Sequence, residues 1–300
     1  MDAGIEKRKE TMKKKKRLVF LLLSCVAILV LGYVILSHIK EKIELNKCDK
    51  IYANQILKLP DKEQNNVGFT CTGLFWDEEE NCFLIGNAGK YQPDDDKFQA
   101  TIEIIEKDFS AIKRSIPCYL NYDDMSDIQG VTKSTDGTIW LCSYGENKVR
   151  HIDRDGNEIG NFDIKEPSGI ANDTRNGTLW VLTKDYLYNC SYDGMVKKTI
   201  KVHINGQDQL FLDEENELIY FSAGADYHGD SYIYTVDLKT TKVEPLYILK
   251  DSYAVEGIVI VNNVLYVLND GYYHDAQISV NQVNMYYLNR LQTKENNNSK

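Results

Sequence analysis

The sequence predicts an all-β protein, a five-bladed β-propeller, preceded by a single transmembrane helix. Three observations support this prediction: a segment that recurs after about forty residues, five copies of one strand–turn–strand pattern, and a long apolar stretch near the N-terminus. The chain has 300 residues, which is enough for one such domain with appendages, and its 20 tyrosines suit β-strands.

The repeat is first visible in DGTIWLCSYGENKVRHIDRDG (136–156), whose opening returns as NGTLWVL at 176–182. Aligned on the first strand, five copies begin at residues 72, 129, 168, 208 and 256, with TGLFWD, QGVTKS, SGIAND, DQLFLD and EGIVIV. A polar turn, a second apolar strand and a third strand follow, and the second strand carries an aromatic residue at Phe83, Trp140, Trp180, Tyr220 or Tyr266. Four short antiparallel strands per unit of about 40–55 residues are typical of a propeller blade.

The ends of the repeat region predict how the ring closes. The last copy lacks a fourth strand after VNMYYLN, whereas KIYANQILKLP (50–60) precedes the first copy as a strand without a blade. We expect this segment to complete the last blade, because that removes the open seam between the first and last blades. If it pairs with the first blade instead, the ring closes differently or a sixth, degenerate blade exists, so a six-bladed propeller is the alternative.

The N-terminal residues predict a membrane anchor. Residues 1–17 are basic, and residues 18–39 are apolar over about the length that crosses a bilayer. We therefore divide the chain into a tail (1–17), a transmembrane anchor (18–39), a stalk (40–49), a propeller (50–290) and a disordered tail (291–300). The basic flank indicates that residues 1–17 stay in the cytoplasm and that the propeller is extracytoplasmic. A cleaved signal peptide is one alternative. A lipoprotein signal at LLSC (22–25) is another, although the apolar run continues past Cys25.

Charge and cysteine content narrow the function classes. The net charge is −10, and residues 41–300, with 26 basic and 42 acidic residues, carry −16, which disfavours binding to nucleic acid. Six of the seven cysteines lie outside the apolar segment, and none forms a CxxC motif. Their irregular spacing leaves disulfides and buried thiols as equal alternatives.

Polar residues are expected to converge at one rim of the propeller, where each first strand begins and each second strand ends. The first set is Thr72, Gln129, Ser168, Asp208 and Glu256, and the second is Asn87, Ser143, Thr183, Asn269 and Asp270. Carboxylate, amide and hydroxyl oxygens suit a hard cation. We therefore expect Ca²⁺ held by Glu256 and Asp208, with help from Asn87, Gln129, Asn269 or Asp270. The alternative is a water-filled tunnel lined by these polar groups.

Three long insertions follow second strands, so they are expected on this same rim. Long loops gathered on one face of a rigid scaffold often bind partners. Aromatic, histidine and acidic side chains in these loops suit a sugar or a cationic group, namely Tyr91, Asp226, Tyr227, His228, Asp230, Tyr272, Tyr273 and His274. Ordinary solvated loops are the alternative.

Other motifs give weaker indications. DRDGN, from Asp153, resembles the start of an EF-hand loop, but Glu158 stands where that loop needs glycine, so we expect a hairpin turn. His151 lies on a third strand and is expected to be packed. The sequence contains no nucleophile elbow, zinc-protease, P-loop or dinucleotide motif.

The x-G-I/V/L strand starts, the aliphatic–aromatic second strands and the DG hairpins resemble NHL-type propellers. The run YAVEGIVIVNNVLYVLNDG is similar to the SdiA-regulated family of bacterial envelope proteins, and the resemblance covers roughly residues 60–290. It implies five blades, an N-terminal membrane segment and bound Ca²⁺, with Glu256, Asn269 and Asp270 as the positions that match by motif. Thr72, Gln129 and Ser168 depart from the acidic residue that the family repeats before glycine.

Two functions of different classes follow. The first is a membrane-anchored, extracytoplasmic binding module for a cell-envelope ligand or protein, with Ca²⁺ at the channel mouth. The second is a metal-dependent, lactonase-like hydrolase, in which the ion activates water, Glu256, Asp208 and Asn87 are ligands, and His228 or His274 carries the proton.

Overall fold

The computed structural model of the chain forms two compact units, Met1–Cys48 and Asp49–Lys300. The structure describes residues 2–45, 47–60, 71–87, 100–118, 128–202, 204, 206–224, 230–269 and 281–288.

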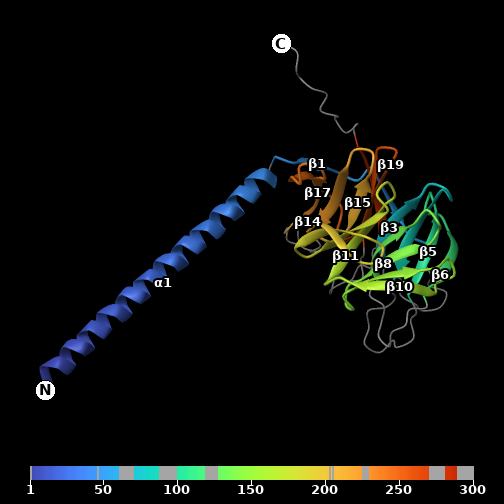
Figure 1. The fold of residues 1–300 in the computed structure, drawn as a ribbon. Coiled ribbons are helices and arrows are strands. Elements are labelled where there is room, and N and C mark those ends of the chain that lie inside the picture. Colours follow the sequence, from blue (N-terminus) through green and yellow to red (C-terminus); the bar gives the residue numbers. More distant parts are fainter. Residues whose placement is uncertain are drawn as a thin grey trace, which may run out of the picture. The chain divides into compact units, whose positions relative to one another are not determined.

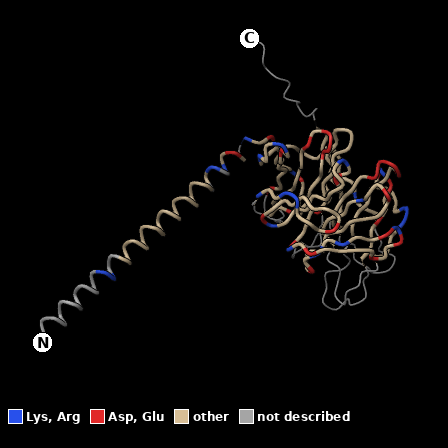
Figure 2. The backbone as a smooth tube through the Cα atoms, viewed as in Figure 1, with Lys and Arg blue, Asp and Glu red and all other residues tan. Residues whose placement is uncertain are grey.

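The first unit is a single helix, α1 (Asp2–Leu45). Its stretch Val19–Leu45 is long and apolar enough to cross a membrane, as an anchor or as a signal sequence. Figure 2 shows most of this stretch without charged residues. Ser24 and Ser37 donate their hydroxyls to the carbonyls of Phe20 and Val34 within the helix, at 2.9 and 2.8 Å, so neither adds an unsatisfied group to the apolar surface.

The second unit contains five sheets, each built around an antiparallel set of strands, which confirms the five-bladed propeller (Figure 1). The first blade comprises β3 (Cys71–Asp77), β4 (Cys82–Asn87), β5 (Thr101–Glu106) and β6 (Ile112–Pro117). The second comprises β7 (Ile128–Lys133), β8 (Ile139–Ser143), β9 (Lys148–Ile152) and β10 (Glu158–Asp163). The third comprises β11 (Pro167–Asp173), β12 (Thr178–Thr183), β13 (Tyr186–Cys190) and β14 (Val196–Lys201).

The last two blades use strands from both ends of the unit. The fourth comprises β15 (Leu210–Asp213), β16 (Leu218–Ala223), β17 (Ser231–Asp237) and β18 (Val243–Leu249), with β1 (Asp49–Ile51) added in parallel to β18. The fifth comprises β19 (Val255–Val261), β20 (Val264–Asn269), β21 (Gln282–Tyr287) and, as its outer strand, β2 (Gln55–Lys58). The expected ring closure is therefore confirmed. The segment does more than expected, because Asp49–Ile51 also covers the edge of the fourth blade.

The hydrophobic core lies between blades. Leu84 and Ile102 of the first blade share a buried cluster with Val131 and Leu141 of the second. The fifth and first blades meet in the same way, and Tyr266 lies 5.0 Å from the ring of Phe83. Of the repeated aromatic residues of the second strands, Phe83, Trp140, Trp180 and Tyr220 are buried. Each blade thus buries its faces only against its neighbours, which is why the sequence repeats.

The structure also shows the state of the cysteines, of the DRDGN segment and of His151. Cys82, Cys142 and Cys190 are unpaired buried thiols, and burial raises the pKa of Cys82 and of Cys190 to about 11. The backbone N–H groups of Asp155 and Asn157 donate to the carboxylate of Asp153, so DRDGN is a hairpin turn as predicted. His151 is packed as predicted, with its ring stacked on Trp140 at 3.8 Å.

Candidate functional site

The two rims of the propeller differ, and each is named here after the residues that form it. The collar rim is the one where β3, β7, β11, β15 and β19 begin and where β4, β8, β12, β16 and β20 end. The turn rim is the opposite one, where first strands lead into second strands through connections of two to five residues. The first strands are the innermost strands of all five sheets, so both rims open onto the central channel.

Glycines allow the innermost strands to approach one another closely at the collar rim. A Cβ added to Gly169 would lie 2.7 Å from the backbone nitrogen of Leu210 in the next blade. One added to Gly257 would lie 2.6 Å from the Cβ of Leu74, also in a neighbouring blade. Because real Cβ atoms do not approach other atoms so closely, glycine is required where the blades converge.

Four first strands also carry a β-bulge at this position. The register against the second strand shifts at Thr72 in β3, between Ile128 and Val131 in β7, between Pro167 and Ile170 in β11, and at Glu256 in β19. In the fourth blade the register is regular over Leu210–Asp213. Just before it, the Asp208 N–H donates to the Ser222 carbonyl and the Ser222 N–H donates to the Gln209 carbonyl, so two residues face one there as well. Bulges re-aim side chains and often lie beside functional sites. The bulged positions include Gln129 and Glu256, two of the expected collar ligands.

The fourth blade has Gln209 where the other blades have glycine. Its side chain is buried, and its Nε2 donates to the backbone carbonyl of Gln129 in the second blade at 3.3 Å. The same Nε2 lies 3.3 Å from Oδ1 of Asp208. Oxygens from the second and fourth blades therefore converge on one nitrogen at the collar rim, although these blades are separated by the third.

Other collar residues take part in local structure. Asn269 ends β20, where its Oδ1 accepts from the N–H of Tyr253 at 2.9 Å and its Nδ2 donates to the carbonyl of Val267 at 3.0 Å. Asn87 ends β4 and is fully buried. The Thr72 hydroxyl is buried without a hydrogen-bond partner in the part of the chain that the structure describes.

Two collar hydroxyls belong to a neighbouring turn or ion-pair network. The Ser143 hydroxyl donates to the Glu146 carboxylate at 2.6 Å, and that carboxylate also pairs with the buried Arg150 guanidinium at 2.7 Å. The Thr183 hydroxyl donates to the carbonyl of Tyr186 at 3.0 Å. These two side chains therefore shape the collar rim and are less suited to hold an ion. The sequence pattern placed them on the rim but carried no sign of these partners.

The predicted loop residues are described only in part. Asp230 forms an ion pair with Lys250, next to β17. The others, together with Asp270, lie outside the described residues, namely Tyr91, Asp226, Tyr227, His228, Tyr272, Tyr273 and His274. Their loops connect β4 to β5, β16 to β17 and β20 to β21, so all three leave from the collar rim.

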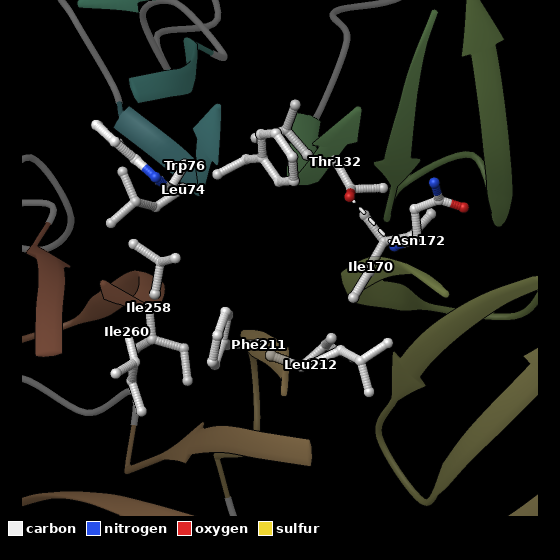
Figure 3. A pocket seen from close by; sticks show the side chains of 14 residues that line it. Leu74, Trp76, Thr132, Ile170, Asn172, Phe211, Leu212, Ile258 and Ile260 are labelled. Atoms are coloured by element: carbon white, nitrogen blue, oxygen red, sulfur yellow. Dashed lines mark hydrogen bonds between the residues drawn. The ribbon is translucent and has the colours of Figure 1, made fainter. Parts of the chain in front are cut away.

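Apolar side chains line the channel between the collar rim and the turn rim. The sequence pattern did not predict this apolar lining. A cavity of about 110 Å³ lies between the five innermost strands (Figure 3). Its walls include Leu74, Val131, Ile170, Leu210 and Ile258. Apolar residues follow the glycine or glutamine in each first strand, but the same pattern also arises when side chains pack between blades.

Comparisons with known proteins do not assign the chain to a family. No protein-family model and no curated protein matches the chain. One similar solved structure is virginiamycin B lyase from Staphylococcus aureus, with 17% identity, a TM-score of 0.43, and coverage of 71% of this chain and 66% of that one. Another is the WD40 repeats of RRP9, with 11% identity, a TM-score of 0.45, and coverage of 75% and 63%. The chain thus spans slightly less than two thirds of each of these structures.

Proposed function

We propose that the protein is a binding module whose collar rim receives a cell-envelope ligand or protein. The difference between the two rims carries this proposal. The connections 88–100, 224–230 and 270–281 leave from the collar rim, whereas the connections on the turn rim that join first to second strands have two to five residues. Four β-bulges lie at the collar rim as well. Long loops on a rigid scaffold, next to re-aimed side chains, are suited to recognition.

The apolar helix supports the second part of the proposal, a single-pass anchor with the propeller outside the cytoplasm. Lys15 and Lys16 precede the apolar stretch on its N-terminal side, as in segments whose N-terminus stays cytoplasmic. Reporter fusions to the two chain ends test this orientation. A periplasm-active or surface-active reporter should work only at the C-terminus, and activity at the N-terminus alone would reverse the topology.

The third part is Ca²⁺ at the collar, as a structural or bridging ion. Glu256 and Asp208 would hold it, with oxygens of Asn87, Gln129, Asn269 or Asp270, and the ion would offer an electropositive centre to an acidic or hydroxylated ligand. The convergence of Gln129 and Asp208 oxygens on one Nε2 supports this donor set. The resemblance of YAVEGIVIVNNVLYVLNDG to SdiA-regulated proteins supports it independently.

Calorimetric titration of the detergent-solubilised full chain with CaCl₂ tests the ion. We expect saturable binding that is lost in Glu256→Gln and in Asp208→Asn, with unchanged circular dichroism. Asp155→Asn, on the exposed β9–β10 turn, is the matched control and should bind like the wild type. Equal binding by all four proteins would refute the collar site. Lactone hydrolysis by the Ca²⁺-loaded wild type that Glu256→Gln abolishes would identify the alternative, a metal-dependent hydrolase.

Site-specific photo-crosslinking in cells tests the binding face. A crosslinking amino acid replaces Tyr91 or Tyr272 in the collar-rim loops, or Tyr192, which is 42% exposed on the turn rim, as the control. We expect one discrete crosslinked partner from the loop positions and none from position 192. The reverse pattern would place the binding face on the turn rim.

A further inference from the structure

The channel cavity is a separate candidate site from the collar. Its deep wall consists of aliphatic side chains that are almost completely buried, with Ile258 at 1% and Val131 at 3% exposure. Leu74 and Ile170, labelled in Figure 3, and Leu210 complete this wall. All five blades contribute one of these residues, so the cavity follows the central axis. Apolar cavities of this size bind small apolar molecules in preference to water.

The polar residues of the wall, Thr132 and Asn172, already form hydrogen bonds within the protein. The Asn172 backbone N–H donates to the Thr132 hydroxyl at 3.2 Å, as drawn in Figure 3. The Asn172 side chain donates to the carbonyl of Lys133 at 3.4 Å and accepts from the Tyr192 hydroxyl at 2.8 Å. The polar part of the wall is therefore engaged in joining the second and third blades, which leaves an aliphatic surface as the main feature of the cavity.

The two ends of the cavity differ. Towards the collar rim, the Gln209 side chain reaches from the fourth to the second blade, one residue before Leu210 of the cavity wall. Towards the turn rim, the lining side chains Trp76, Phe211 and Ile260 are only partly buried. The end of the cavity nearer the turn rim is therefore the less buried one, and its hydrophobic edge is a surface that a ligand could cover.

Acidic side chains near the turn-rim end of the cavity favour a ligand with a positively charged head group. Trp76 is followed by Asp77 and by Glu78, Glu79 and Glu80, and Leu212 is followed by Asp213, Glu214 and Glu215. Of the cations on this rim, Lys133 forms ion pairs with Asp77 and Glu80, and Arg175 lies 3.8 Å from Glu214. Carboxylates that outnumber the cations in these two turns attract cations and repel anions. The indole of Trp76 adds a favourable surface for an ammonium group.

We propose that the channel cavity binds the alkyl part of a small aliphatic ammonium compound, with the ammonium group at the acidic turn rim. The aliphatic wall sets the apolar part of the ligand, the cavity volume limits it to a short chain, and the carboxylates of the two turns set the sign of its head group. This site is independent of the collar and of any ion bound there.

Methyl NMR of the full chain in phosphatidylcholine nanodiscs tests the proposal, with n-pentylammonium as the probe. The δ1-methyl signals of Ile170 and Ile258, which line the cavity, should shift and saturate with n-pentylammonium. The signals of Ile105 and Ile152, fully buried in other clusters, are the internal controls and should stay in place. n-Pentanol should bind more weakly, and pentanoate should cause no shift. Absence of saturable shifts at the two cavity methyls, or equal shifts with pentanoate, would overturn the proposal.

Two variants make the test specific. Ala171 lines the cavity, and Ala171→Val should weaken n-pentylammonium binding at least about tenfold, because the added methyl groups occupy the space of the ligand. Ala111→Val, at an exposed position in the first blade, is the matched control and should bind like the wild type. Glu78→Gln with Glu79→Gln, on an exposed turn, should weaken ammonium binding roughly two- to fivefold and leave n-pentanol binding unchanged. Wild-type affinity in Ala171→Val would exclude the cavity as the binding site.

Discussion

The side-chain amide of Gln209, in the fourth blade, donates a hydrogen bond to the backbone carbonyl of Gln129, in the second blade, at 3.3 Å. These blades are not neighbours, so the side chain lies across the channel. It occupies the position that glycine holds in the other four blades. One buried amide therefore links two blades that are not neighbours, between the polar collar residues and the apolar cavity that begins at Leu210.

Replacing Gln209 by alanine should destabilise the propeller by about 1–2 kcal/mol, because the partly buried carbonyl of Gln129 loses a donor and the buried Gln209 side chain is removed. Thermal unfolding of the detergent-solubilised full chain, followed by near-ultraviolet circular dichroism, measures the change. Gln55→Ala is the control, since Gln55 is exposed on the outer strand β2. An unchanged melting temperature for Gln209→Ala would show that the bond across the channel contributes nothing to the fold.

The fold could be read from the sequence because each blade repeats the same local information. The starts at Thr72, Gln129, Ser168, Asp208 and Glu256 follow from the repeated strand and turn pattern, and the closing role of residues 50–60 follows from the missing outer strand of the last copy. The parallel pairing of Asp49–Ile51 with β18 could not be predicted, since three residues carry no pattern that selects a partner.

The sequence could predict on which rim the site residues lie, but not which of their side chains meet. Strand direction placed Asn87, Asn269, Gln129 and Glu256 on one rim, and the structure confirms that placement. Which oxygens face one another depends on bulges and on the long reach of side chains such as that of Gln209, neither of which leaves a local pattern. The aliphatic cavity was missed for a related reason, because residues such as Ile258 look the same in the sequence whether they face a neighbouring blade or the channel.

The closing strand should matter for stability through its inner face. Leu57 of β2 is partly buried and packs against the cluster shared by the fifth and first blades, so Leu57→Ala should cost about 1–2 kcal/mol. Ile56 is 50% exposed on the other face of the same strand, and Ile56→Ala should cost less than about 0.5 kcal/mol. Thermal unfolding of both variants checks this difference. Equal effects would mean that β2 does not seal the ring through its side chains.

An ion pair on the turn rim should fasten the first blade to the second. Lys133 pairs with Asp77, and their side chains are only 14% and 6% exposed. Lys133→Met should destabilise the protein by about 2–3 kcal/mol, because the buried Asp77 carboxylate loses its counter-charge. Asp77→Asn added to that variant should recover part of the loss, since the asparagine oxygen still accepts from the N–H groups of Glu79 and Glu80. A double variant less stable than Lys133→Met would contradict this account.

His151 should make the propeller less stable in mild acid. Burial against Trp140 lowers the pKa of the His151 imidazole, and the nearby Asp136 only partly opposes this shift. In the unfolded chain the imidazole titrates near its ordinary pKa of about 6.5, so below that pH the unfolded state binds more protons. The contribution of His151 is therefore complete above about pH 6.5 and declines as the pH falls from there towards the lower folded-state pKa.

His151→Phe isolates this effect, because it keeps an aromatic ring against Trp140 and removes the titrating group. It also loses the hydrogen bond between Nε2 and the Thr138 hydroxyl, at 2.7 Å, so its melting temperature at pH 7.5 should be slightly lower than that of the wild type. Between pH 7.5 and 5.5 the wild type should lose more of its melting temperature than the variant does. The other histidines titrate in both proteins, so the difference belongs to His151, and parallel pH profiles would show that its burial has no energetic consequence.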